Sequence, residues 1–372
     1  MKRTLAKTKD GWHALKGRGH SSNGHALSGR ATRRVLWVGM VLANSMINLA
    51  GFTFAAHPHA AERITSLTNK DVKFTTPAAH HVVLRRGPIT AVIVDNAAVD
   101  VPECPGHRAG YNGVAVLKHA QREGNYFVPA VAGLNFEHIH DGSREMIDKE
   151  RFEPRKAPMQ LRVVDEHTVE VHQPPTPNMK LESCGRYRLL DDGTIEYTFE
   201  CIPRADTYRN GYLGLFWASY INQPESTEIQ FRGQRADETE PSGWSRATSR
   251  AHGVDSTHPP AGPLPKLPHD DPFPATLIFN RSPFVYREPW YFGVSHGLAY
   301  VQMFRERDRI WFGQSPTGGG NGNPAWDFQW FVLEPKVGEA YGFTMRAALV
   351  PETDRETIQR GTEKHRTHLK LK

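Results

Sequence analysis

After residue 61, apolar residues occur in short segments rich in β-branched and aromatic side chains, and Gly, Pro, Asn and Asp separate these segments. No segment there keeps the three- and four-residue apolar spacing of a long helix. The pattern predicts strands at 72–94, 114–118, 127–136, 160–164, 168–172, 212–222, 275–279, 298–304, 309–312, 326–333 and 341–350. One short helix is expected at 142–151. We therefore predict an all-β fold, a large antiparallel β-sandwich.

The segment 184–201 predicts a hairpin with a defined register. Leu190–Thr194 has the composition of a three-residue loop, and this loop gathers the aromatic side chains of both strands on one face. Cys184 then lies opposite Glu200, whereas a two-residue loop would pair it with Cys201 and place two arginines among the aromatic rings. Cys104 is the third cysteine, so the count is odd. We expect three free thiols.

Residues 1–61 have the pattern of an export leader. A basic stretch ends at Arg33-Arg34, an apolar run covers 35–54, and small residues follow up to Ala61. The arginine pair resembles the twin-arginine type of bacterial leader. An uncleaved anchor is the alternative, since the run is close to the ~20 residues that span a bilayer; three polar residues inside it favour cleavage. We expect a periplasmic or extracellular protein without a stable membrane anchor.

The distribution of charge argues against nucleic acid as a partner, although the pI is 9.2. The whole chain carries +6, of which residues 1–56 contribute +8 and residues 360–372 contribute +4, which leaves about −6 for 57–359. A duplex-binding protein needs its cations on the folded surface. We expect a single sandwich domain over 62–359, followed by a basic disordered tail at 360–372.

Residues 255–274 contain seven prolines. Proline lacks the amide donor of a sheet ladder, so this segment is expected to be a loop that interrupts the sandwich. Two interpretations remain: a solvated surface loop, or a semi-rigid flap over a binding cleft.

The run Asn135–Gly142 holds the first candidate chemistry. If it is extended, alternation places Phe136, His138 and His140 on one face. Two imidazoles at this spacing reach one metal ion when a third ligand joins them, and His296 is the natural third. General acid–base catalysis by His138, His140 and His296 is the preferred interpretation, because imidazole titrates near neutral pH. A pair of histidines at a strand end without function is the remaining alternative.

The loop 313–324 is rich in glycine and leads into an aromatic strand. Its backbone is able to approach a ligand closely, and amide side chains within it form paired hydrogen bonds. The candidate binding residues here are Gln314, Asn321, Asn323, Trp326 and Asp327. Amides, a carboxylate and indole rings suit a sugar. The alternative is a flexible hairpin loop followed by core tryptophans.

The strand 211–222 has two apolar faces, and most such faces pack under a second sheet. Otherwise Tyr220 and Asn222, near its end, border a cleft. The chain lacks a Gly-x-Ser-x-Gly elbow, Cys-x-x-Cys, His-Glu-x-x-His and a Gly-x-Gly-x-x-Gly after a strand, so common serine hydrolase, redox, zincin and dinucleotide-binding functions have no support.

A family resemblance rests on the C-terminal third. The runs Ser295–Leu298, Val301–Phe304 and Val337–Phe343 look like those of a set of exported bacterial proteins. The ending is also similar to the final strands of the galactose-mutarotase-like supersandwich group, over roughly 275–350. That group includes aldose epimerases, polysaccharide lyase domains and non-catalytic modules. In the epimerases a histidine acts as acid and a glutamate as base, but this chain does not reproduce their motifs, so no catalytic residue is carried over.

We therefore expect an exported carbohydrate-active enzyme that acts on a polysaccharide or its fragments by proton transfer, of lyase, epimerase or hydrolase type. His138 or His140 would be the acid or base and His296 its partner, while Arg144 or Arg305 would hold a substrate carboxylate or hydroxyl. No cofactor is expected, with a divalent metal at the three histidines as the alternative. The other class of function is a non-catalytic glycan-binding or envelope protein. The glycan and its linkage are left open.

Overall fold

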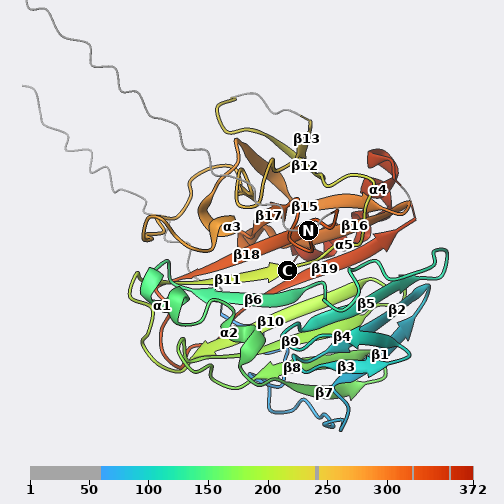
Figure 1. Ribbon diagram of the computed structural model, residues 1–372, viewed down its shortest axis with the longest axis horizontal. Helices are drawn as coiled ribbons and strands as arrows, with labels where there is room; N and C mark the ends of the chain where they lie inside the picture. Colours follow the sequence, from blue (N-terminus) through green and yellow to red (C-terminus); the bar gives the residue numbers. More distant parts are fainter. Residues whose placement is uncertain (1–59, 239–242, 321, 352, 372) are drawn as a thin grey trace, which may run out of the picture. The chain divides into compact units, whose positions relative to one another are not determined.

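The computed structural model describes residues 60–238, 243–320, 322–351 and 353–371. These residues belong to one compact unit that covers 54–372. Most of them lie in antiparallel strands, and the few helices are short, as Figure 1 shows. The all-β sandwich predicted from the sequence is confirmed. Nearly all of the leader and Asn321 lie outside the described residues.

Two large sheets form the sandwich. The first has nine strands in the order β13 (Trp244–Ala247), β12 (Ile229–Arg235), β15 (Phe284–Ser295), β16 (Leu298–Phe304), β19 (Tyr341–Val350), β10 (Ile195–Pro203), β9 (Leu181–Leu189), β8 (Thr168–Gln173) and β7 (Gln160–Asp165). The second has five strands in the order β14 (Thr257–His258), β17 (Trp311–Ser315), β18 (Ala325–Leu333), β11 (Tyr212–Ala218) and β6 (Asn135–His140).

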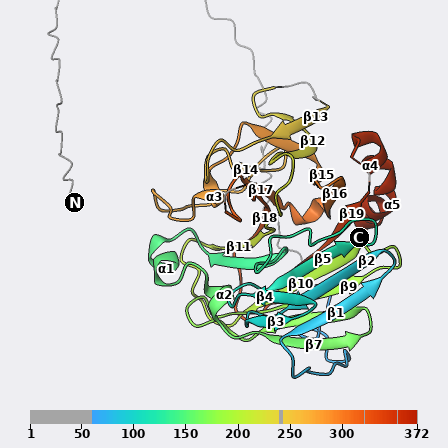
Figure 2. The same cartoon turned by 45° about the vertical axis from the view of Figure 1, so that its right-hand side comes forward.

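Smaller elements complete the fold. A three-stranded sheet contains β1 (His81–Arg86), β2 (Ile89–Val94) and β5 (Gly113–His119), and a two-stranded sheet contains β3 (Val99–Val101) and β4 (Cys104–His107). Figure 2 shows these strands, in blue and teal, beside β7 and β9. The helices are α1 (Arg144–Lys149), α2 (Glu153–Lys156), α3 (Thr276–Phe279), α4 (Arg355–Gly361) and α5 (Glu363–Leu371), with a 3-10 turn η1 (Glu306–Asp308). The strand predicted at 275–279 is wrong: α3 lies there.

Aromatic side chains fill the space between the two large sheets. Trp217 of β11 stacks on Phe328 of β18 with ring centroids 5.1 Å apart, and its edge meets Phe343 of β19 at 5.1 Å. Trp326 and Trp330 also belong to this core. Aromatic rings of this size bury large apolar areas, so this layer holds the two sheets together.

The predicted hairpin register is confirmed. Strands β9 and β10 pair Tyr187 with Tyr197 and Cys184 with Glu200. Gly193 has φ +83°, the left-handed conformation that the three-residue loop requires. Cys184, Cys201 and Cys104 are buried and free.

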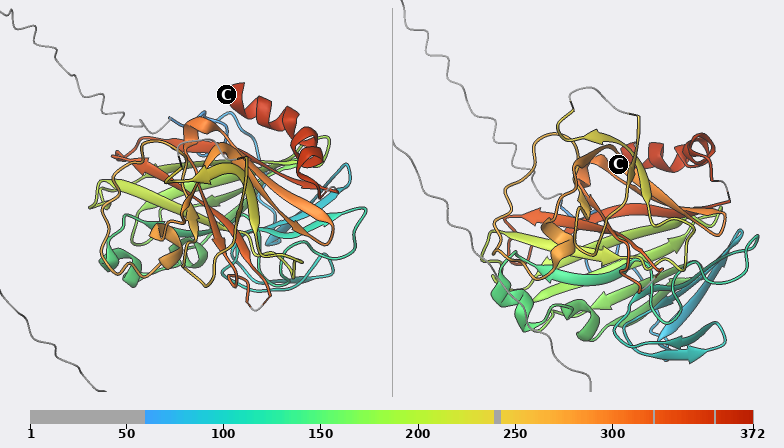
Figure 3. Two further views of the ribbon diagram at one scale, coloured as in Figure 1. Left: turned by 90° about the horizontal axis from the view of Figure 1, so that it is seen from above. Right: turned by 45° about the horizontal axis from the view of Figure 1, so that its top comes forward.

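The C-terminal tail is not disordered, which corrects the expectation for 360–372. Its residues up to Leu371 form the end of α4 and the whole of α5, and α5 (red in Figure 3) packs against β16 and β19. Ile358 and Leu369 are buried there, and His365 bonds to Asp192 and Thr194 of the β9–β10 turn. These contacts outweigh the unfavourable charge of a basic segment.

Candidate functional site

A β-bulge sets the outer face of the five-stranded sheet. Phe216 of β11 pairs with His138 and the next residue, Trp217, pairs with Phe136, so Glu137 is an extra residue in β6. Phe136 consequently points into the inter-sheet core, whereas His138 contacts Phe216 of the outer-face cluster. The predicted shared face for Phe136, His138 and His140 is therefore wrong. Bulges of this kind re-aim side chains beside functional sites.

The Glu137 carboxylate is the centre of a buried polar cluster. It accepts hydrogen bonds from the Tyr220 hydroxyl and from Asn135 Nδ2 at 3.0 Å, and His138 Nε2 lies 3.3 Å from Oε1. Arg155 Nη1 lies 4.0 Å from Oε2. Burial by itself raises the pKa of Glu137, but the hydrogen bond and charge of His138, with Arg155 and Tyr220, outweigh it and hold the pKa below its usual value. Glu137 is therefore a carboxylate at neutral pH.

Both ring nitrogens of His138 face oxygen atoms. Nδ1 lies 2.6 Å from the Arg151 carbonyl oxygen, and Nε2 faces Glu137. Each ring nitrogen of His138 therefore faces a hydrogen-bond acceptor. The ring packs on Phe152 and Phe216, with centroids 4.9 and 5.5 Å away.

The pKa values of two further groups near Glu137 are raised. Burial, and then the charge of Glu137, raise the pKa of Tyr220 well above its usual value. Burial and the charge of Glu137 also raise the pKa of Asp327 well above its usual value, and its Oδ2 has no hydrogen-bond partner among the described residues. The site thus sets the Glu137 carboxylate beside a neutral phenol, a pairing that acid–base chemistry uses.

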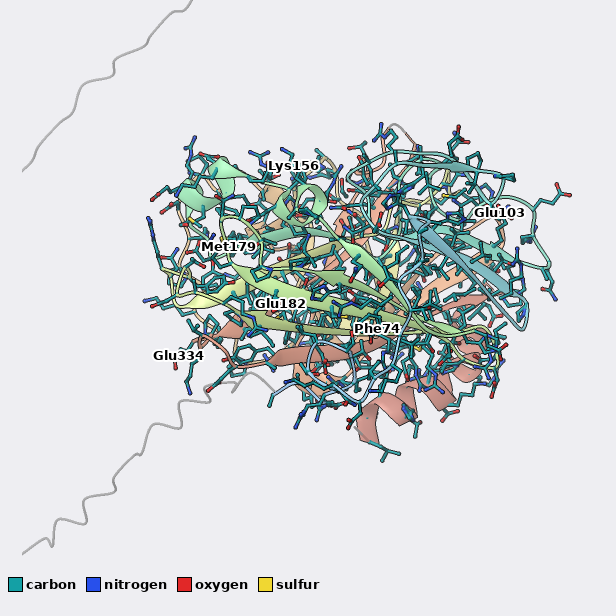
Figure 4. All side chains as sticks on the ribbon, turned by 90° about the horizontal axis from the view of Figure 1, so that it is seen from below. Phe74, Glu103, Lys156, Met179, Glu182 and Glu334 are labelled. Carbon is teal, nitrogen blue, oxygen red and sulfur yellow. The ribbon has the colours of Figure 1, made fainter. Side chains whose placement is uncertain are left out.

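Arg155 lies between this cluster and a cavity of about 410 Å³. Its Nε donates to the Gly110 carbonyl oxygen at 2.6 Å, and its guanidinium lies 3.9 Å from the Tyr111 ring centroid and 4.7 Å from that of Phe152. The cavity is lined by Asn96, Ala109, Gly110, Phe152, Arg155 and Lys156, and Figure 4 labels Lys156 on α2. Arg155 thus contacts both the cavity and Glu137.

His140 is sealed off from solvent. It is fully buried among Tyr212, Phe273, Phe279 and Phe331, and neither ring nitrogen has a hydrogen-bond partner among the described residues. Burial, with the charges of His138 and His269, lowers the pKa of His140 to about 3. The cavity at Arg155 does not include His140, and a catalytic role for this histidine stays a prediction.

The proline-rich segment does cover part of this face. Phe273 packs on the His140 ring at 5.6 Å, and the Tyr212 hydroxyl donates to the Pro268 carbonyl oxygen at 3.0 Å. These contacts show that part of 255–274 packs on the sheet, and the flap over a binding cleft stays a prediction.

His296 belongs to a different group of residues. It lies in the β15–β16 turn with φ +53°, is exposed, and its Nε2 lies 3.0 Å from the Asn222 carbonyl oxygen. Asn323 Oδ1 accepts from the Gln223 backbone amide at 2.9 Å. The structure therefore brings Asn222, His296 and Asn323 together, but no contact joins them to His138 or Glu137 among the described residues.

Four other predicted site residues have structural contacts instead. Gln314 is fully buried, with its amide bonded to the backbone of Thr227 and Ser249, and the Trp326 indole donates to Thr227 at 3.2 Å. The side chains of Gln314 and Trp326 are fully enclosed, and their role in ligand binding stays a prediction.

Arg305 is buried and ion-paired with Asp308 at 2.7 Å and with Glu62, so it anchors the N-terminal segment and is not available to a substrate. Arg144 is exposed on α1 and pairs with Asp148 at 3.0 Å. It does not line the cavity beside Arg155. Both predicted substrate-binding roles lack a supporting contact.

No group of three or more potential metal ligands occurs within the described ranges. His138 and His140 pair with protein oxygens and aromatic rings respectively, and His296 bonds elsewhere, so the alternative of a three-histidine metal site does not fit these residues. Over the same ranges, no helix is long and apolar enough to cross a membrane.

Sequence reasoning missed Glu137, Asn135 and Arg155. Glu137 lies in the run 135–142, but strict alternation of side chains along a strand placed it on the face opposite His138. Arg155 comes from α2, and its approach to Glu137 and Tyr111 depends on tertiary packing that no local pattern encodes.

No family model matches this chain, and no curated protein matches it. Among solved structures, it is similar to a suggested aldose 1-epimerase of Escherichia coli K12, with 8% identity, a TM-score of 0.42, and coverage of 74% of this chain and 99% of that one. A protein of Synechocystis sp. PCC 6803 has 10% identity, a TM-score of 0.42, and coverage of 76% and 99%. A heparan sulfate lyase of Pedobacter heparinus has 11% identity and a TM-score of 0.31; 77% of this chain covers 38% of that one.

Proposed function

We propose that this protein is a carbohydrate-active enzyme in which Tyr220 and His138 transfer protons beside the Glu137 carboxylate. The observation that carries the proposal is the Tyr220–Glu137–His138 cluster, buried on the outer face of the five-stranded sheet next to the cavity at Arg155. Tyr220 or His138 would give a proton to the sugar, and Glu137 would take the proton that the sugar or a water molecule loses. Because Glu137 contacts both side chains, it would then pass that proton back to the acid.

The cavity supports a sugar as the substrate. Arg155 offers guanidinium donors, the Asn96 side chain lies at the lining, and Phe152 contributes its ring, which also contacts His138 and Arg155. Sugar hydroxyls need planar hydrogen-bonding partners, and the apolar face of the ring stacks on an aromatic side chain. The sequence resemblance over 275–350 supports the same substrate class. Proton transfer at a sugar carbon or at a glycosidic oxygen would give a lyase, epimerase or hydrolase.

A non-catalytic glycan-binding protein is the second candidate. One observation favours it. The side chains of Glu137 and His138 are only 9% and 6% exposed, and the Arg155 guanidinium lies 4.0 Å from the Glu137 carboxylate. A binding module would hold a glycan in the cavity at Arg155, and the Tyr220–Glu137–His138 cluster would stay buried.

The two candidates are separated by turnover. The purified protein without its leader is incubated with a panel of polysaccharides, while ultraviolet absorbance of unsaturated sugar ends, release of reducing ends and sugar epimerisation are recorded. Activity on any member that disappears in Tyr220→Phe supports the enzyme. Binding without any of the three signals supports the binding module and rejects the catalytic proposal.

Export is part of the proposal and rests on the leader in residues 1–61. Cleavage between Ala56 and Glu62 would release a periplasmic or extracellular protein, and a cut near Ala56 would keep Ala61, whose amide donates to the Ala340 carbonyl oxygen at 3.0 Å. N-terminal sequencing of protein from the native host tests this. A chain that still contains residue 40 would reject cleavage.

A further inference from the structure

Two cavities lie on either side of the β1–β2 turn, away from the candidate site. One, of about 470 Å³, is lined by residues of β1, β2 and the end of β5, and the other, of about 350 Å³, by the β9–β10 turn and α5. Arg85 lines the first and the next residue, Arg86, lines the second. Gly87, at the turn, lies against the Asp191 carbonyl oxygen, so the β1–β2 and β9–β10 turns pack together and bring the two linings close to each other.

The first cavity contains a row of cations set by strand register. Arg85 pairs with Thr90 and Thr90 pairs with Lys118, so the three side chains share one face of the three-stranded sheet. The strands are about 4.8 Å apart, which separates the Arg85 and Lys118 backbones by roughly 10 Å. Both cations are exposed, and no carboxylate among the described residues pairs with either.

Arg122 adds a third cation to this row. It follows β5 and lines the same cavity, where Glu123 is the one acidic lining residue. Its guanidinium lies against Gly297, and a side chain at that position would overlap it. The Gly297 backbone, with φ +70°, thus leaves the space that Arg122 fills.

The second cavity continues the positive surface. Its lining has four Lys/Arg residues against two aspartates: Arg86, Arg188, Arg346, Lys364, Asp191 and Asp192. Asp191 pairs with Arg86 and Asp192 with Lys364, so the carboxylates hold the cations in place. His365 fixes α5 to this turn through Asp192. The second cavity exists only because the C-terminal tail folds as a helix.

The charge of this surface contrasts with that of the rest of the chain. Residues 57–359 carry about −6, yet the linings of both cavities are net positive. Concave surfaces of one sign concentrate a ligand of opposite charge. Neither lining includes a Phe, Tyr or Trp ring, which a single-stranded nucleic acid would use for base stacking. An anionic polymer that binds through its substituents alone fits better.

We propose that these two cavities form one binding surface for an anionic polysaccharide, with carboxylate or sulfate groups held by Arg85, Lys118 and Arg122 on one side and by Arg188 and Lys364 on the other. The choice of a polysaccharide rests on the function proposed above, while the choice of an anion rests on the lining itself. The surface would hold the polymer while the site at Tyr220 acts on a different part of it.

The test measures affinity for heparin, polygalacturonate and dextran, as sulfated, carboxylated and neutral probes. Arg85→Ser with Lys118→Ser is compared with Lys70→Ser and Lys73→Ser, a pair that removes the same charge from exposed lysines elsewhere. We expect binding of heparin or polygalacturonate that weakens as salt rises, a loss of roughly tenfold or more in the Arg85/Lys118 variant, and no change in the control pair. Dextran should not bind.

Equal losses in both variants would show an effect of net charge only and would overturn the proposal, as would the absence of binding to both anionic probes. Binding of duplex DNA as tightly as either glycan would overturn the choice of partner. The outcome is independent of catalysis: Tyr220→Phe should bind the anionic probes as the parent does, and the Arg85/Lys118 variant should keep its turnover of short oligosaccharides.

Discussion

The Tyr220 hydroxyl donates a hydrogen bond to the Glu137 carboxylate, although the two residues are 83 positions apart in the sequence. Glu137 occupies the bulge of β6, and Tyr220 follows β11, the strand that pairs with β6. The bulge turns Glu137 toward Tyr220 and away from the core, so a local irregularity of one strand creates the cluster on which the proposed function depends.

Gly214 should tolerate no side chain. It pairs with His140 across β11 and β6, and a Cβ at this position would overlap the imidazole ring. Gly214→Ala should lower the free energy of unfolding by about 1–3 kcal/mol, as measured by urea denaturation. Gly243→Ala, where the new Cβ meets only an ordinary contact, is the control. In a His140→Ala background the cost of Gly214→Ala should shrink, and an unchanged cost would contradict the proposed overlap.

His140 and His258 should make stability depend on acidity. Burial lowers the pKa of both to about 3, so they are neutral in the folded protein at pH values where the unfolded chain binds protons. Stability is therefore unaffected by them above pH ~6.5 and falls as pH decreases from there toward ~3, by about 1.4 kcal/mol per pH unit for each histidine. The measurement is the free energy of unfolding at several pH values. His140→Phe or His258→Phe should each reduce the slope, and an unchanged slope in both would refute this origin.

The C-terminal helix should contribute to stability through one leucine and not its neighbour on the same helix. Leu369 is 2% exposed and packs in a cluster with β15 and β16 residues, whereas Leu371 is 83% exposed. Leu369→Ala should cost about 2–5 kcal/mol of unfolding free energy, and Leu371→Ala about 0.5 kcal/mol or less. Similar small values for both would mean that α5 does not dock in solution.

The thiols should be unreactive until the protein unfolds. Cys104, Cys184 and Cys201 are buried, and burial raises the pKa of each; that of Cys104 rises to about 11. Since the thiolate is the nucleophile, Ellman's reagent should titrate almost no thiol in the folded protein and about three after denaturation. Detection of a single thiol in denatured protein would instead indicate a disulfide.

The sequence predicted those features that local rules determine. The β9–β10 register followed from loop length and from the requirement that Tyr187 and Tyr197 share a face, and both conditions are local. The bulge at Glu137 could not be predicted in this way, because it depends on how β6 pairs with β11. The burial of His140 could not be predicted either. It depends on Phe273 and Phe279, which are far from His140 in the sequence and pack on its ring.

The candidate site was found in part. His138, Tyr220 and Asp327 were singled out and do lie in or beside the cluster, but for reasons of residue type and not of geometry. Arg155 joins them from α2, and His296 bonds to Asn222 instead. Contacts between distant segments leave no periodic signal in either segment. Helix α5 was not predicted because its buried face contains only two residues, His365 and Leu369, which is too few for a periodic apolar pattern.

Comparison of Tyr220→Phe with Tyr212→Phe tests the central claim most directly. Both tyrosines lie on the outer face of the five-stranded sheet, but the Tyr212 hydroxyl donates to the Pro268 carbonyl oxygen, whereas that of Tyr220 donates to Glu137. On whichever glycan the parent turns over, Tyr220→Phe should lower kcat by about 10²–10⁴-fold, the usual contribution of an acid–base group, and Tyr212→Phe should leave kcat almost unchanged. Equal kcat values for the parent and Tyr220→Phe, with both variants folded, would contradict the account.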